Sequence, residues 1–474
     1  MDVQQLNEFV TNHVQESMGN LKKLAAHKCL SPIYNSNWES DGDLTAALKE
    51  VKEYVESLKI NGLLNSQILQ SKGVTPAYYF TVEPTDEDEP YTILFYSHVD
   101  KIPFGTGWSP NKNPEKPAII DGLLYGRGVS NGCYAIFTLA AAIQAIQAQN
   151  QKHPRLVVLI ETSKESGSVD LTEHLTSFVS GIVEPNLIVC LNGEIPTYDY
   201  MCYVTSMKGQ VVFDADIHVL TRAIHSGGFG GLSPDSLTVF DMIMNKIESI
   251  NGNKVTMPLL DEEVTEEETA KANEIATLLG ETFYQNVPTV QGLKLLGDST
   301  SDIYINSVYK PSFNLIGIEK IPNMANAAAS LRPATLFRCC FRLPAKTDVS
   351  AASETIKKAF TEDTPYQAGV EIKNYKLMQG ATFPIADKMK AALEKTSTDV
   401  LDVNKVVYWD NPGTSPHMQI FNALFPDANV LCTGVANMII SNIRGAEENL
   451  SLAYYMKVTK NLSYFISLYN DYKS

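Results

Sequence analysis

Strand-like and helix-like patterns alternate through the first half of this chain. Residues 3–18 and 43–59 carry apolar residues three and four positions apart, the spacing of amphipathic helices. Short apolar runs typical of buried strands follow, together with a long Ala-rich segment that predicts a helix. The strands are expected at residues 78–82, 91–96, 156–160 and 187–191, and the helix at residues 133–147. This alternation predicts an α/β layer around a mostly parallel sheet.

The pattern changes character at residue 207. Residues 210–220 alternate apolar and polar positions, as in a half-exposed antiparallel strand, and a helical segment is expected at residues 234–250. Strand and helix patterns like those of the first half return near residue 386. We therefore expect a discontinuous α/β domain, residues 1–206 and 379–474, interrupted by a smaller α+β lid at residues 207–378.

Composition narrows the class of protein. The chain has 474 residues, of which 44% are hydrophobic and 19% charged, as in a globular protein of two domains. Its net charge of −16 disfavours nucleic acid and anionic membranes as partners. Neither a membrane span nor a secretory signal is expected, because no unbroken apolar run and no basic leader is found. Seven scattered cysteines do not suggest a disulfide framework and favour a reducing, cytoplasmic compartment.

The stretch at residues 93–136 carries the strongest chemical signal. An apolar strand ends in Ser97-His98-Val99-Asp100, and alternate residues of a strand share a face, so His98 and Asp100 point the same way. A carboxylate at this spacing can orient an imidazole, as it does at zinc sites. A loop with Trp108 and the sequence DGLLYGRG then lead into the Ala-rich helix.

This combination resembles the dinuclear-zinc metallopeptidases that include aminoacylases, carnosine dipeptidases, glutamate carboxypeptidases and peptidase T-like enzymes. The resemblance implies two zinc ions, a bridging carboxylate and a glutamate that accepts a proton from the bridging water. It also implies an α/β catalytic domain with an inserted lid. The positions that match the family's metal ligands are His98, Asn131, Glu165, Asn192 and Arg444, and those that match its catalytic residues are Asp100 and Lys164.

Most of these positions hold the wrong chemistry for zinc hydrolysis. Asn131 and Asn192 are neutral amides, which are poor zinc ligands, and Arg444 stands where the family has a histidine. Lys164 occupies the position of the general base, and a protonated lysine cannot accept a proton and repels a metal. We therefore expect no bound metal and no catalysis, with Lys164 and Arg444 balancing the two carboxylates that remain, Asp100 and Glu165.

Two lid residues match family positions that contact substrate. His225, in AIHSGG, matches a lid histidine that reaches the partner's active site in dimeric members, and Arg332, in SLRP, matches a contact to the substrate carboxylate. The lid of this family often carries the dimer contact. The resemblance therefore implies a homodimer through the helix at residues 234–250 and a neighbouring strand.

Two functions remain open. The first is a pseudoenzyme, a carboxypeptidase-like scaffold that acts as a binding or structural protein with a protein partner, possibly within a larger assembly. The second is an active metal-dependent peptidase or amidohydrolase with an unusual metal site. The site residues favour the first, whereas analogy of fold alone favours the second.

Overall fold

The main body of the molecule is built on one large sheet. The structure is a computed structural model that describes residues 1–178, 184–249 and 254–473. The sheet has the strand order β1-β2-β6-β3-β7-β20-β9-β18, and β19 also pairs with β9. Its central strands β6, β3, β7 and β20 run parallel, and antiparallel pairs extend it toward both edges. The bounds are Leu63–Ser71 (β1), Val74–Val82 (β2), Thr92–His98 (β3), Arg155–Glu161 (β6), Leu187–Cys190 (β7), Met201–Met207 (β9), Ala381–Thr382 (β18), Val406–Asn411 (β19) and Asn429–Cys432 (β20).

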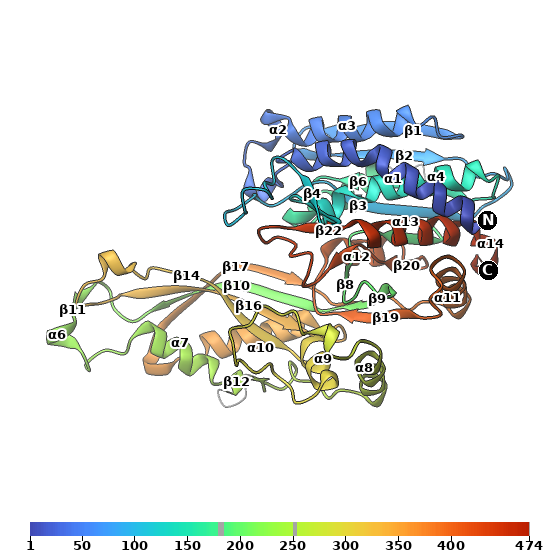
Figure 1. Ribbon diagram of the computed structural model, residues 1–474. Helices are drawn as coiled ribbons and strands as arrows, with labels where there is room; N and C mark the ends of the chain where they lie inside the picture. The colour runs from blue at the N-terminus through green and yellow to red at the C-terminus, as the bar shows by residue number, and fades with distance from the viewer. Residues whose placement is uncertain (179–183, 250–253, 474) are drawn as a thin grey trace.

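Helices from both ends of the chain cover this sheet (Figure 1). Helices α1, α4, α11 and α13 pack in one connected layer, and α3 packs on β1 and β2. The N- and C-terminal segments therefore share one core. The bounds are Val3–Ala26 (α1), Asp43–Ser57 (α3), Ala135–Ala148 (α4), Asp387–Leu401 (α11) and Leu452–Ser467 (α13).

The most apolar helical stretch belongs to this core. Val129–Ala148 has the length and composition of a membrane span, but 94% of its most apolar window is buried inside the protein. A buried core helix passes the same test, so this is weak evidence for a membrane segment. Polar residues, among them Ser130, Asn131 and Gln144, interrupt this stretch, so it contains no unbroken apolar run.

The inserted segment forms a second core (Figure 1, lower body). Its antiparallel sheet has the order β14-β16-β10-β17, with bounds Ser312–Glu319 (β14), Ala334–Leu343 (β16), Gly209–His218 (β10) and Gly369–Met378 (β17). Val211, Phe213, Ala215 and Ile217 alternate along β10 and bury one face with helices α7 (Ser236–Met244) and α10 (Val349–Thr361). The predicted fold class, an α/β domain interrupted by a smaller α+β unit, is confirmed.

Two helices of the inserted segment pack on the larger core instead. Helices α8 (Glu266–Leu279) and α9 (Thr300–Val308) contribute Ile275 and Tyr304 to it. Asp410, in β19, is 4% exposed and accepts hydrogen bonds from Lys271 Nζ at 2.8 Å and from the hydroxyl of Tyr309. This network ties both helices to the main sheet. The boundaries at 207 and 378 remain a prediction, and the segment between them contributes to two cores.

The helix expected at residues 234–250 is shorter than its pattern suggests. Helix α7 ends at Met244, and the backbone N–H of Lys246 bonds to the carbonyl of Ile243 in a turn. The chain then enters the short strand β12 (Glu248–Ser249), which pairs with β13 (Lys254–Val255). The apolar run continues through this turn because Ile247 is buried in the lid core, so periodicity alone cannot mark the end of the helix. The last predicted position, 250, lies outside the described residues.

Candidate functional site

The candidate site lies where neighbouring parallel strands end. His98 closes β3, in register with Glu161 at the end of β6, and Asn192 comes two residues after β7. His98 is 1% exposed, and its Nδ1 lies 3.1 Å from Oδ1 of Asp100. The carboxylate therefore orients the ring, as the spacing in the sequence suggested. Ligand sites of α/β proteins commonly lie at this edge of the sheet.

Asp100 also holds the turn that follows β6. Its Oδ1 accepts the backbone N–H of Lys164 at 3.1 Å, and its Oδ2 accepts that of Glu165 at 2.8 Å. Two backbone N–H groups and the ring of His98 therefore surround the carboxylate of Asp100. The expectation that Lys164 and Arg444 balance both carboxylates fails at Asp100, because both cations lie on Glu165.

Glu165 is the centre of the charge network. Its Oε1 accepts a hydrogen bond from Lys164 Nζ at 2.9 Å, and its Oε2 accepts one from Arg444 Nε at 3.0 Å. The Lys164 and Glu165 side chains are 9% and 4% exposed, whereas that of Arg444 is 51% exposed. Burial by itself raises the pKa of Glu165, but the charges of Lys164 and Arg444 outweigh it and hold the pKa well below its usual range. Glu165 is therefore an ionised carboxylate with two cationic partners.

An amide suits position 131 in this network. Asn131 Nδ2 donates to Glu165 Oε1 at 2.9 Å, and Asn131 Oδ1 lies 3.4 Å from Lys164 Nζ. A carboxylate at this position accepts hydrogen bonds but has no N–H to give to Glu165. The amide of Asn131 therefore serves Glu165 as a donor and Lys164 as an acceptor at the same time.

These residues do not fit a pair of zinc ions. Both oxygens of Glu165 are already bonded to cationic side chains, and no bridging carboxylate stands at 131 or 192. At the positions that match the family's ligands, Nε2 of His98 and the amide of Asn192 are buried without a hydrogen-bond partner among the described residues. One imidazole and one amide are a poor donor set for zinc.

Glu161, a buried acid beside this site, is not among the residues predicted from the sequence. Glu161 is fully buried and accepts hydrogen bonds from Ser163 at 2.9 Å, from Ser168 at 2.7 Å and from the hydroxyl of Tyr96. Burial, and then repulsion by Asp100, raise the pKa of Glu161 to about 7. Its position at the end of an apolar strand, three residues before Lys164, was the available signal.

The two lid residues lie in a separate environment. The guanidinium of Arg332 donates to both oxygens of Asp235 at 2.8 and 2.9 Å, at the start of α7. His225 is exposed, and its Nδ1 lies 3.0 Å from the carbonyl oxygen of Ala329. Among the described residues, no hydrogen bond or ion pair joins either side chain to the network around Glu165.

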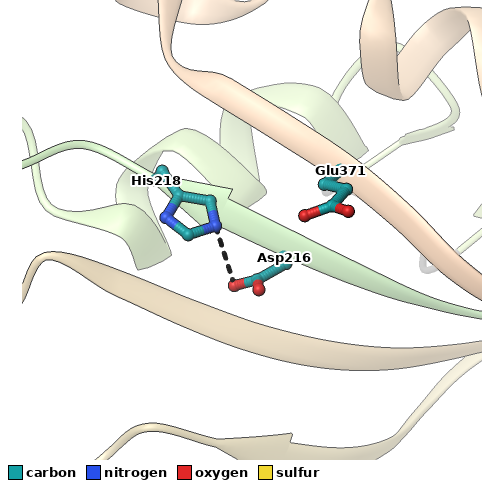
Figure 2. Close-up of side chains that lie close together, drawn as sticks. All are labelled: Asp216, His218 and Glu371. Carbon is teal, nitrogen blue, oxygen red and sulfur yellow. Dashed lines mark ion pairs between the residues drawn. The ribbon is translucent and has the colours of Figure 1, made fainter.

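One group of side chains elsewhere has the composition of a metal site. Asp216, His218 and Glu371 offer ligand atoms within 4.8 Å of one another, and they are the only such group in the described ranges. Figure 2 shows them side by side on β10 and β17, with His218 Nε2 3.3 Å from Asp216 Oδ1. Lys320 Nζ, however, lies 2.7 Å from each oxygen of Asp216, and Lys373 Nζ lies 2.8 Å from Glu371. Lysines therefore neutralise these carboxylates too.

Comparisons with known proteins place this geometry in a family. The model of peptidase family M20/M25/M40 matches residues 94–467. The cysteinylglycine-S-conjugate dipeptidase of Corynebacterium striatum is 23% identical over 364 residues, which cover 76% of this chain and 77% of that protein. The human Beta-Ala-His dipeptidase is 26% identical over 280 residues, 56% of this chain and 53% of that protein.

Solved structures give the same picture of the fold. Human carnosine dipeptidase 1 superposes with a TM-score of 0.78 at 19% identity, covering 98% of both chains. The M20 family metallo-carboxypeptidase Sso-CP2 of Sulfolobus solfataricus gives a TM-score of 0.75 at 18% identity, covering 96% of this chain and 99% of that one. At these identities the likeness shows a shared fold.

Proposed function

Because this chain belongs to peptidase family M20/M25/M40, we propose that it is a dipeptidase-like member that has lost metal binding and catalysis and acts as a binding or structural protein. The observation that carries the proposal is the bonding of Glu165 to Lys164 and Arg444. The side chains of Lys164 and Arg444 thus bind the carboxylate that, by the family resemblance, would be a zinc ligand.

The proton chemistry supports the same conclusion. Hydrolysis by the family mechanism needs a base that takes a proton from water. Lys164 stands at that position as a buried ammonium in an ion pair, which has no lone pair to accept a proton. Asp100 already accepts two backbone N–H groups and contacts His98. The carboxylates beside Lys164 are therefore committed to structural contacts.

A second candidate function rests on the unpartnered atoms. Nε2 of His98 and the amide of Asn192 are buried without partners among the described residues, and the Asp216–His218–Glu371 group could hold an ion. An active metal-dependent peptidase or amidohydrolase with an unusual metal site would use such atoms. The lysines on both carboxylate groups make this the weaker candidate.

The proposed binding role calls for a protein partner in the cytoplasm. The seven cysteines are all free and buried, which suits a reducing compartment. A homodimer through the lid is one assembly that fits, because edge strand β14 exposes Ile316 and Ile318, and α7 exposes Met242. The net charge of −16 disfavours nucleic acid and anionic membranes as partners.

Metal content and hydrolysis test the proposed loss of function. We expect the purified protein to carry no stoichiometric zinc, and to leave dipeptides and N-acyl amino acids intact with added zinc, cobalt or manganese. The matched control is the quadruple variant Asn131→Asp, Lys164→Glu, Asn192→Asp, Arg444→His, which restores the family's ligands and base. This variant should recover zinc binding before turnover. Stoichiometric zinc in the unmodified protein, or chelator-sensitive hydrolysis, would contradict the proposal.

A further inference from the structure

A groove runs along the N-terminal helix, on elements distinct from those of the family site. It consists of two adjoining hollows of about 490 and 200 Å³ that share Asn20, Tyr54 and Ser57. Helix α1 forms one wall, α3 the other, and Phe137 and Gln144 of α4 line it between them. The part of α1 that lines the groove, from residue 9 to residue 24, spans about 22 Å at 1.5 Å per residue.

The wall formed by α1 is mainly polar although it faces another helix. The lining residues recur three and four positions apart, so they share one face of the helix. A helix face that packs closely on a neighbour is normally apolar, as the adjacent face of α1 is, with Leu6, Val10 and Val14 in the main core. The lining residues of α1 in the larger hollow are Phe9, Asn12, His13, Glu16, Ser17 and Asn20. This polar face leaves a groove where close packing would have closed the gap.

The floor of the groove is aromatic and uncharged. His13 Nε2 lies 2.8 Å from the hydroxyl of Tyr54, and these side chains are only 7% and 8% exposed. The ring of Phe9 stacks on that of His13 with the ring centroids 6.0 Å apart, and the ring centroids of Phe137 and Tyr54 are 4.7 Å apart. Burial lowers the pKa of His13, so the ring is neutral at pH 7. Because His13, Tyr54 and Phe137 are nearly buried, the floor offers an uncharged surface rather than open aromatic faces.

The rim of the groove is acidic. Glu16 on α1 and Glu53 on α3 are exposed, and neither has an ion-pair partner in the described part of the chain. Lys23 is the one basic residue of the lining, and its ammonium lies 2.9 Å from Glu50, so it is already neutralised. A ligand with positively charged groups therefore matches the acidic rim, and the uncharged floor does not repel it.

We infer that the groove between α1 and α3 binds a basic, extended segment of a partner protein through its lysine or arginine side chains. A groove of about 22 Å accommodates about six extended residues at 3.3–3.6 Å each, which is longer than one small cation needs. The net charge of −16 favours a basic partner. The inference goes beyond the proposed loss of catalysis and does not depend on it, since none of the lining residues belongs to the family site.

Binding of a defined peptide to the full chain tests this inference. The probe is fluorescein-labelled hexa-arginine amide, followed by anisotropy at physiological salt. Glu16→Gln with Glu53→Gln should weaken binding by about five- to tenfold, the loss expected for two partly exposed ion pairs. Asn20→Trp keeps every charge but fills the junction of the hollows, and it should weaken binding by a similar factor. Hydrogen exchange should slow in α1 and α3 when the peptide binds.

The matched control removes two carboxylates elsewhere. Glu354 in α10 and Glu394 in α11 are exposed and, within the described residues, carry no ion pair, so Glu354→Gln with Glu394→Gln alters the net charge equally. The control should change affinity by less than about twofold. The inference is overturned if the control weakens binding as much as the groove variants do, if the groove variants bind normally, or if spermidine binds as tightly as the peptide.

Discussion

The family site and the lid sheet both pair carboxylates with lysines, and the two sites differ in depth. At the family site, Lys164 and Glu165 are 9% and 4% exposed, at the end of the central strands of the main sheet. On the lid sheet, Asp216 is 6% exposed, but its partners Lys320 and Lys373 are 43% and 45% exposed. The chemistry is the same, whereas the access of water to the cation differs several-fold.

This difference decides what each contact does for the fold. A buried carboxylate that loses its cation keeps an uncompensated charge away from water, which is strongly destabilising. A carboxylate whose cation is half exposed exchanges that partner for water at little cost. The family site should therefore depend strongly on Lys164, whereas the lid cluster should depend little on either of its two half-exposed lysines.

The largest expected effect comes from Lys164→Met. Removing the nearly buried ammonium leaves Glu165 with the half-exposed Arg444 as its only cation, so the free energy of unfolding should fall by about 2–3 kcal/mol. The matched control is Lys320→Met on the lid, where Lys373 Nζ remains 3.7 Å from Asp216 and the loss should be about 1 kcal/mol or less. Urea unfolding measures both variants, and equal losses would remove the distinction between the two sites.

The next effect is the dependence of stability on pH. The folded pKa of Glu165 lies below its unfolded value of about 4.3, so the unfolded state binds the proton more readily. Its contribution to stability is complete above about pH 5 and is lost as the pH falls through 4 toward the folded pKa. Glu165→Gln should flatten this acid dependence in urea unfolding at pH 3–7. A variant with the same acid slope as the unmodified protein would show that Glu165 does not carry it.

Arg444→Met should cost less than Lys164→Met. Half of the Arg444 side chain is exposed, so water can replace part of its interaction, and Lys164 still lies 2.9 Å from Glu165. We expect a loss of about 1–2 kcal/mol, because a hydrogen-bonded charge is removed from a partner that stays paired. Differential scanning calorimetry checks the order of the two variants. A larger loss for Arg444→Met would mean that the guanidinium is the main partner of Glu165.

Local pattern was sufficient to predict the fold class and several of the positions around the site. The strand ending at His98 and the paired orientation of Asp100 follow from the period of a strand. The amides at 131 and 192 and the cations at 164 and 444 could be read directly against the family motif.

Contacts between distant segments could not be read from the sequence. Whether Arg444 meets Glu165 or Asp100 depends on how a turn 279 residues away approaches the strand ends. The attachment of α8 and α9 to Asp410 likewise depends on tertiary packing, as does the Asp216–His218–Glu371 cluster, which joins two strands more than 150 residues apart. Glu161 was overlooked because a single acid at a strand end is unremarkable until its burial is known.

The smallest expected effect concerns zinc at the lid cluster. Lys320 and Lys373 occupy the carboxylates of Asp216 and Glu371, so zinc near 0.1 mM should leave the melting temperature of the unmodified protein unchanged. The double variant Lys320→Ala, Lys373→Ala frees a His and two carboxylates within 4.8 Å of one another, and zinc should then stabilise it by about 1 kcal/mol or less. Adding His218→Ala to that variant should abolish the gain, because it removes the imidazole ligand. If zinc instead stabilises the unmodified protein, and His218→Ala abolishes that stabilisation, the lid cluster is a metal site. It would then differ from the family site, where Lys164 and Arg444 occupy the carboxylate of Glu165.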